Sequence, residues 1–187
     1  MSSLDKFSGE NLKNIIKQNI NKLKAQKTVL EISLKIKETA EIAEDNLFSE
    51  NQGKDIVDDI TDLTEKRGEI VEEIKNINAA IRHYRLKLPN QYAQALDDAE
   101  KKAKLKQSYP KDINCPAWVI NLYKLMLEQQ IVLEKIKNAD EINNKLLKKL
   151  IEAVSERNNI IKNNRILMDK FDQSGDMPAG SIFRSKK

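Results

Sequence analysis

The clearest pattern of apolar and polar positions in the chain runs from Asp55 to Leu88. Ten positions in this stretch follow one another at alternating spacings of four and three residues, and only Arg67 among them is charged. Such a rhythm is typical of a helix that packs lengthwise on another helix. We predict a partner-binding seam formed by Ile56, Ile60, Leu63, Arg67, Ile70, Ile74, Ile77, Ile81 and Tyr84, with Leu88 as the tenth position.

A charged residue inside such a seam has two interpretations. Arg67 selects helix register and partner at some cost in stability, or it faces water where the helices splay apart. We favour the selector role, so Arg67→Leu is expected to raise thermal stability while loosening partner choice or oligomeric state. Gly68 lies outside the seam and costs about 1 kcal/mol relative to alanine. We interpret it as a tolerated weak spot, with a functional hinge as the alternative.

A second long helix is predicted before this seam, from about Ser8, a suitable capping residue, to Phe48. Its apolar stripe shifts partway round the helix, which indicates more than one partner helix or a local change of supercoil. The segment Ser49–Gly53 is a clear turn, and its Ser and Gln resemble a capping box. Because so short a turn makes the helices antiparallel neighbours, we expect a helical hairpin over residues 9–88, after an N-terminal arm of residues 1–8.

Residues 89–115 are predicted to hold a short helix and a connector. Pro89 disfavours helix at the residue before it, so the preceding helix is expected to end at Leu88. From Asn90 to Gln107 the apolar face is small and rich in alanine, and Ser108–Cys115 has the composition of a connector. The face consists of Tyr92, Leu96, Ala99 and Ala103.

Residues 116–172 are predicted to form one long helix or a pair of helices. Pro116 suits the first turn of a helix, and the stretch from Trp118 to Leu127 is apolar nearly all the way round, which indicates the centre of the fold. Asn138 with Glu141 resembles a second cap, so we expect a break or bend there. The apolar centre comprises Trp118, Val119, Leu122, Tyr123 and Met126. After it the apolar face narrows to a single stripe of Leu133, Ile136, Leu147, Leu150, Val154, Ile161 and Met168. Polar residues fall on the same stripe, at Gln129, Asp140, Asn143, Arg157 and Asn164.

Residues 173–187 have a different composition, because Gly175, Pro178 and Gly180 disfavour a helix. A flexible basic tail is the first interpretation. The alternative is a docking peptide in which Ile182, Phe183 and Arg184 are captured by a partner.

Charge alternates in blocks along the chain. Residues 11–30 carry a net charge of +5, residues 31–73 carry −9, and residues 74–96 carry +4. In a hairpin the acidic block lies at the tip and both basic blocks lie at the open end. Either the tip suits a basic partner and the open end an acidic one, or the blocks are a solvated charged surface with accidental clustering. The basic patch consists of Lys13, Lys17, Lys22, Lys24, Lys27, Arg82, Arg85 and Lys87.

The sequence contains little that points to catalysis or to a cofactor. The single histidine, His83, falls off the seam, and the single cysteine, Cys115, has no second histidine to act as a base. No metal-ligand spacing and no glycine-rich phosphate loop occurs in the sequence. We therefore predict no catalytic, metal or cofactor site and no small-molecule ligand.

The 187 residues, 33% of them charged and only 5% aromatic, favour an all-α fold: an elongated antiparallel helical hairpin or bundle with coiled-coil segments. No apolar run is long enough to span a membrane, the first residues do not resemble a secretory signal, and one cysteine fits a reducing compartment, so we expect a cytoplasmic protein. The expected function is non-catalytic: an assembly subunit, adaptor or chaperone that joins a homo- or hetero-oligomer through its helices. A nucleic-acid-associated helical protein that uses the basic end is the alternative, and a helical-bundle enzyme is a third.

Overall fold

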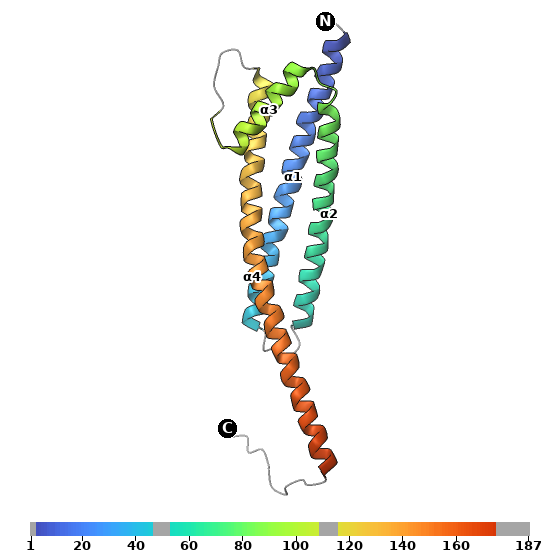
Figure 1. Ribbon diagram of the computed structural model, residues 1–187, viewed down its shortest axis with the longest axis vertical. Helices are drawn as coiled ribbons and strands as arrows, with labels where there is room; N and C mark the ends of the chain where they lie inside the picture. The colour runs from blue at the N-terminus through green and yellow to red at the C-terminus, as the bar shows by residue number, and fades with distance from the viewer. Residues whose placement is uncertain (1–2, 47–52, 109–115, 175–187) are drawn as a thin grey trace. The chain divides into compact units, whose positions relative to one another are not determined.

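The computed structural model describes residues 3–46, 53–108 and 116–174, and these residues are almost entirely helical (Figure 1). The helices are α1 (Ser3–Asn46), α2 (Gly53–Arg85), α3 (Asn90–Lys104) and α4 (Ala117–Ser174). No strand occurs in the described ranges, so the predicted all-α class is confirmed. The chain divides into two compact units, residues 1–146 and residues 147–187.

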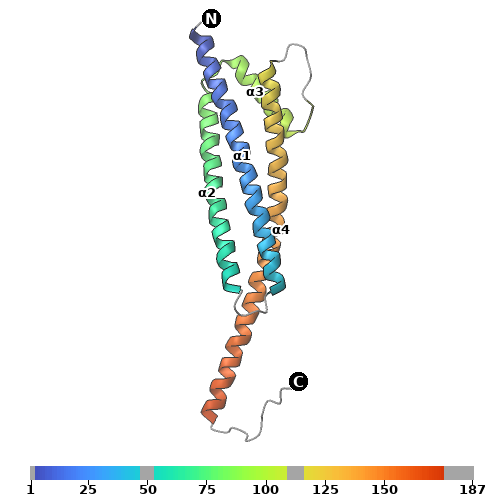
Figure 2. The same cartoon turned by 180° about the vertical axis from the view of Figure 1, so that it is seen from behind.

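In the first unit, α1, α2 and the first half of α4 lie side by side; α1 appears between the other two in the upper part of both views and crosses α4 in the lower part (Figures 1 and 2). Helices α1 and α2 run antiparallel, as the predicted hairpin requires. Helices α1 and α4 run parallel, because Gln129 and Asn143 each contact the residue 110 positions earlier, Asn19 and Ser33 respectively. The unit is therefore a bundle in which α2 is antiparallel to both of its neighbours.

Helix α2 turns its predicted seam toward the bundle. All positions from Ile56 to Leu88 on the seam are buried or half-buried, whereas most of the residues between them are exposed. Ile70 and Ile74 pack against a buried cluster that combines α1 and α4, formed by Leu23, Val29, Val132 and Ile136. The seam side chains in this cluster thus contact helices of their own chain.

Two further clusters form the core near the start of α4. In one, Ile15 of α1, Leu122 of α4 and Leu96 of α3 pack with Leu88, and Tyr84, Tyr92, Trp118 and Met126 cover them. In the other, the alanine-rich face of α3 meets the first turns of α4, through Ala99, Ala103, Val119 and Tyr123. The predicted apolar centre therefore lies in the core, and the small face of α3 allows it to approach α4 closely.

Two helix ends differ from the sequence expectation. Helix α2 ends at Arg85 instead of Leu88, because residues 86–88 tighten into a turn before Pro89, where the Leu88 N–H donates to the Arg85 carbonyl over 3.1 Å. Helix α3 ends at Lys104 instead of Gln107, because Lys106 adopts a positive φ of 51° and the Gln107 N–H returns to the Lys102 carbonyl.

Helix α1 begins at Ser3, so Ser8 is a helical residue and the expected N-terminal arm of residues 1–8 is mostly part of the helix. Helix α4 continues through Asn138 without the break that we expected there. The polar residues that resembled a cap instead lie on a regular helix, and Asp140 and Asn143 bond to Ser33 of α1.

The second unit contains the continuation of α4 from Leu147 to Ser174. None of the side chains described between residues 147 and 168 is buried. Large apolar side chains are among them, with exposed fractions of 69% for Ile151, 60% for Ile160 and 68% for Met168. The predicted turn cap Ser49–Gln52, the thiol of Cys115, and the tail residues Ile182, Phe183 and Arg184 lie outside the described residues.

Candidate functional site

The basic patch predicted from the sequence separates into two groups. Lys22 and Arg85 are half-buried and, together with exposed Arg82, line a pocket. The others are exposed, and the Lys27 ammonium pairs with the Glu128 carboxylate over 2.7 Å. The exposed members outside the pocket are Lys13, Lys17, Lys24, Lys27 and Lys87. Fewer free cations remain for phosphate contacts than the sequence indicated.

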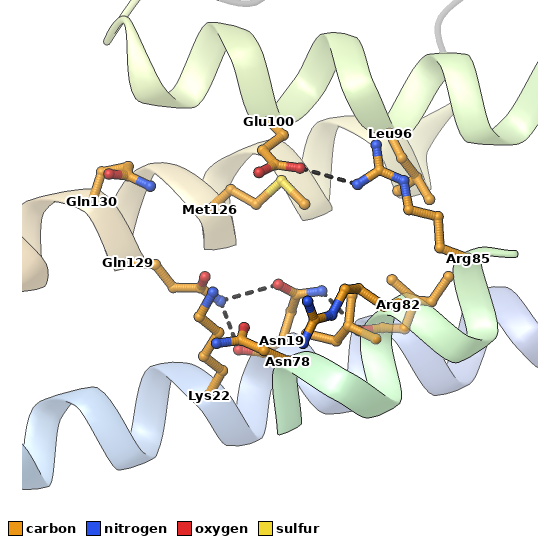
Figure 3. A pocket seen from close by; sticks show the side chains of 12 residues that line it. Asn19, Lys22, Asn78, Arg82, Arg85, Leu96, Glu100, Met126, Gln129 and Gln130 are labelled. Atoms are coloured by element: carbon orange, nitrogen blue, oxygen red, sulfur yellow. Dashed lines mark hydrogen bonds and ion pairs between the residues drawn. The ribbon is translucent and has the colours of Figure 1, made fainter. Parts of the chain in front are cut away.

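The pocket has a volume of about 340 Å³ and is bounded by all four helices (Figure 3). Its apolar lining residues come from all four helices, and its polar lining residues come mainly from α1, α2 and the first third of α4. The lining residues are Ile15, Asn19, Lys22, Asn78, Ile81, Arg82, Arg85, Leu96, Glu100, Met126, Gln129 and Gln130.

Lys22 enters this pocket from α1, on the turn that also carries the buried residue Leu23. Burial lowers the pKa of the Lys22 ammonium from its ordinary value of 10.5, because a charge loses hydration there. The carboxylate of Glu100 opposes this effect, and the charge of Lys104 adds to it. Neither the Lys22 ammonium nor the Arg82 guanidinium makes a hydrogen bond or an ion pair with any residue that the structure describes.

Glu100 and Arg85 form an ion pair on the α3 side of the pocket. The Arg85 guanidinium contacts the Glu100 carboxylate at 3.1 Å and also pairs with Asp97, while the Lys104 ammonium lies 2.9 Å from Glu100. Burial alone acts to raise the pKa of Glu100, but hydrogen bonds and charge from Lys104 and Arg85 together lower it below 4.5. Glu100 therefore stays ionised at neutral pH and holds Arg85 in place.

A buried amide pair joins α1 and α4 at the back of the pocket. The Gln129 side-chain N–H donates to the Asn19 carbonyl over 2.9 Å and to the Asn19 side-chain oxygen over 3.2 Å. The Asn19 amide in turn donates to the Ile15 carbonyl over 2.9 Å. Because both side chains are 3% exposed or less, this pair fixes the parallel register of the two helices.

Arg67 lies in a second polar network, about midway along the same bundle. Its Nε donates to the Ser33 hydroxyl over 3.0 Å and its Nη2 lies 2.5 Å from an Asp140 oxygen. The Ser33 hydroxyl donates to the other Asp140 oxygen over 3.2 Å, and the Asn143 amide donates to the Ser33 carbonyl over 2.9 Å. This network connects α1, α2 and α4, and the register-selecting role of Arg67 stays a prediction.

His83 is exposed and makes an edge contact with the Tyr84 ring, with 5.8 Å between centroids. No group of three His, Cys, Asp or Glu side chains in the described ranges has a geometry suited to a metal ion. None of the helices in the described part of the chain is long and apolar enough to cross a membrane. The arrangement around Lys22 is suited to binding through charge and hydrogen bonds.

The fold and the site define the class of this protein as an all-α helical bundle with buried polar layers. Nothing matches the chain in comparisons with protein-family models, curated proteins and solved structures.

Several residues of these polar layers were missed by sequence reasoning. On α1, Asn19, Gln26 and Ser33 recur every seven residues and are 2%, 1% and 0% exposed. Gln129 and Asn143 recur on α4 with twice that spacing. Polar residues at heptad spacing on both helices are the signal that predicts these layers. The polar positions on α4 were recognised from the sequence, but those on α1 were not.

Proposed function

We propose that this protein is a non-catalytic helical interaction protein, an assembly subunit, adaptor or chaperone that binds another helix through the second half of α4. The observation that carries the proposal is the exposed apolar surface between residues 151 and 168. Six of the fourteen exposed large apolar side chains among the described residues lie in this stretch of 18 residues. Clustered apolar exposure of this kind is typical of a protein–protein contact surface.

The spacing of this surface favours a helix as the bound element. Leu147, Leu150, Val154, Ile161 and Met168 continue the four-and-three rhythm of a helical seam. Arg157 and Asn164 fall on the same track, as polar residues do when they limit a seam to one register or partner.

The packing of the α2 seam inside the bundle favours α4 as the helix that contacts a partner. Ile70 and Ile74 already pack on the α1 and α4 cluster, so an external helix must displace them to use the same side chains. Val154 and Ile161, 43% and 42% exposed, need no such rearrangement.

Paired substitutions test the proposal. Val154→Asn with Ile161→Asn removes two seam side chains, and Leu34→Asn with Ile131→Asn is the matched control, because those side chains are 50% and 42% exposed and lie in the first unit. If the bound helix belongs to a second copy of this chain, light scattering of the unaltered chain is expected to show a mass above the 21.5 kDa of one chain. If it belongs to another protein, affinity capture from native cells is expected to retain a defined protein. Either result must disappear in the α4 variant and persist in the control.

A monomer that captures the same proteins whether or not Val154 and Ile161 are replaced refutes the proposal. Circular dichroism of both variants confirms that each remains helical, so that loss of binding is not loss of fold.

A further inference from the structure

The pocket contains two cationic side chains, Lys22 and Arg82, that no carboxylate in the described part of the chain contacts directly. The Lys22 ammonium and the Arg82 guanidinium have no hydrogen-bond or ion-pair partner among the described residues, whereas Arg85 and Lys104 are occupied by Glu100 and Asp97. Half-burying an ammonium without a partner destabilises the folded state, because its hydration is only partly replaced. A bound anion removes that penalty.

Neutral hydrogen-bonding groups accompany these cations. The side-chain amides of Asn78 and Gln130 line the pocket and make no hydrogen bond within the described part of the chain. In Figure 3, Lys22, Asn78 and Arg82 lie on one side of the view and Glu100 on the other. Arg85 and Gln130 lie on the Glu100 side of the view, so the cations without a carboxylate partner, with Asn78, are on the other side. This arrangement favours a ligand that carries its negative charge at one end.

The remaining wall suits an apolar body. Ile15 and Leu96 belong to the buried core, and Met126 packs against it, so these side chains offer a hydrocarbon surface at the base of the pocket. Binding pockets for small molecules combine such a surface with a few directed polar groups, at volumes of about 300–1,000 Å³. A volume of about 340 Å³ places this pocket at the small end of that range.

We propose that the pocket between Lys22, Arg82 and the Ile15, Leu96 and Met126 wall binds a small organic anion, a carboxylate or a phosphate monoester with a compact apolar body. Lys22 and Arg82 contact the anionic group, and Asn78 donates a further hydrogen bond. The ion pair of Glu100 and Arg85 bounds the α3 side of the pocket. This site is independent of the α4 surface proposed above.

Titration with simple probes tests the proposal on the full chain. Benzoate and phenyl phosphate carry the two candidate anionic groups on the same ring, and phenyltrimethylammonium carries the opposite charge. Trp118, the single tryptophan, packs in the cluster that contains Ile15 and Leu96 and so reports binding by its fluorescence. Isothermal titration calorimetry gives the stoichiometry and affinity.

At least one of the two anions is expected to bind saturably with one site per chain, and the cation is not. Saturation by benzoate alone identifies a carboxylate site, and saturation by phenyl phosphate alone identifies a phosphate site. Lys22→Met and Arg82→Gln are each expected to weaken binding by about tenfold or more, as loss of one charge-assisted contact implies. The matched controls Lys24→Met and Lys87→Gln, exposed and outside the pocket, leave the affinity within about twofold.

Absence of saturable binding by both anions overturns the proposal, as does equal binding of the cation, or an affinity that neither pocket variant changes. Arg82 is exposed, so Arg82→Gln is expected to fold. If Lys22→Met fails to fold, the affinity of Arg82→Gln for the two anions tests the proposal.

Discussion

Replacing Arg67 by leucine probes the polar network that connects α1, α2 and α4. The substitution removes the hydrogen bond from Nε to Ser33 and the ion pair with Asp140 at 2.5 Å. It leaves the Asp140 carboxylate, 35% exposed, with only the buried Ser33 hydroxyl as a partner among these groups. The sequence alone favoured a gain in stability, but the presence of Asp140 reverses the expected sign.

The magnitude follows from the exposure of the pair. Fully exposed ion pairs contribute up to about 1 kcal/mol, and removing one partner of a fully buried pair costs about 3–5 kcal/mol. The Arg67 and Asp140 side chains are 26% and 35% exposed, so we place the loss at about 2 kcal/mol. The new leucine recovers about 1 kcal/mol through apolar burial. A net destabilisation of about 1 kcal/mol corresponds to a decrease in Tm of about 2–4 °C for a chain of this length.

A double-mutant cycle measured by chemical denaturation isolates this interaction. Arg67→Leu and Asp140→Leu are each expected to destabilise the chain, and the double variant is expected to recover at least about 1 kcal/mol relative to their sum, because it leaves no unpaired charge. Lys66→Leu, at the exposed neighbouring position, is the control and should change stability by less than about 0.5 kcal/mol. An Arg67→Leu variant as stable as the unaltered chain, or strictly additive effects, would refute the reasoning.

Three further substitutions have expected outcomes. Glu100 has a pKa lowered below 4.5, so the stability that its carboxylate contributes is fully present above that pH and is lost as the pH falls through the folded-state pKa. The stability difference between the unaltered chain and Glu100→Gln, measured by denaturation at a series of pH values, should therefore be constant near neutrality and decrease only in acid. Lys22 has a pKa lowered below 10.5, so its charged form destabilises the folded chain at neutral pH and Lys22→Met should raise the free energy of unfolding there. This gain in stability should decrease as the pH rises toward 10.5, and a gain that is independent of pH contradicts the desolvation of Lys22. Gly68 is exposed within α2 and an added Cβ meets nothing within 4 Å, so Gly68→Ala should raise the free energy of unfolding by about 1 kcal/mol; a loss of stability would indicate a required bend.

The periodicity of α2 was predictable because local physics sets it. A residue on the seam returns to the same face every three or four positions, so the exposure pattern from Ile56 to Leu88 follows the sequence closely. The alanine face of α3 was predictable for the same reason, since it depends on neighbouring residues alone. Pro89 indicated that α2 ends before it, but the predicted last residue, Leu88, was wrong, because the helix ends at Arg85.

Pairings across the bundle were not predictable from one sequence. A heptad repeat of apolar residues predicts that a helix has a buried face. It does not indicate which other helix covers that face or in which register the two helices pack. Asp140 bonds to a side chain 73 residues earlier, and Glu100 meets Arg85 only because α3 folds back on the bundle. The pocket depends on the placement of four helices at once, so its basic residues were recognised as a patch on the surface and not as the lining of a cavity.

The parallel register of α1 and α4 imposes an order on folding during synthesis. Gln129 and Asn143 leave the ribosome 110 residues after the groups they bond to, which at about 5–20 residues per second takes roughly 5–20 s. The hairpin of α1 and α2 is complete well before that time. Leu23 and Val29 are covered only in part, by Ile70 and Ile74, in the nascent chain until Val132 and Ile136 are synthesised, and during this interval a chaperone or a wrong helix can bind them.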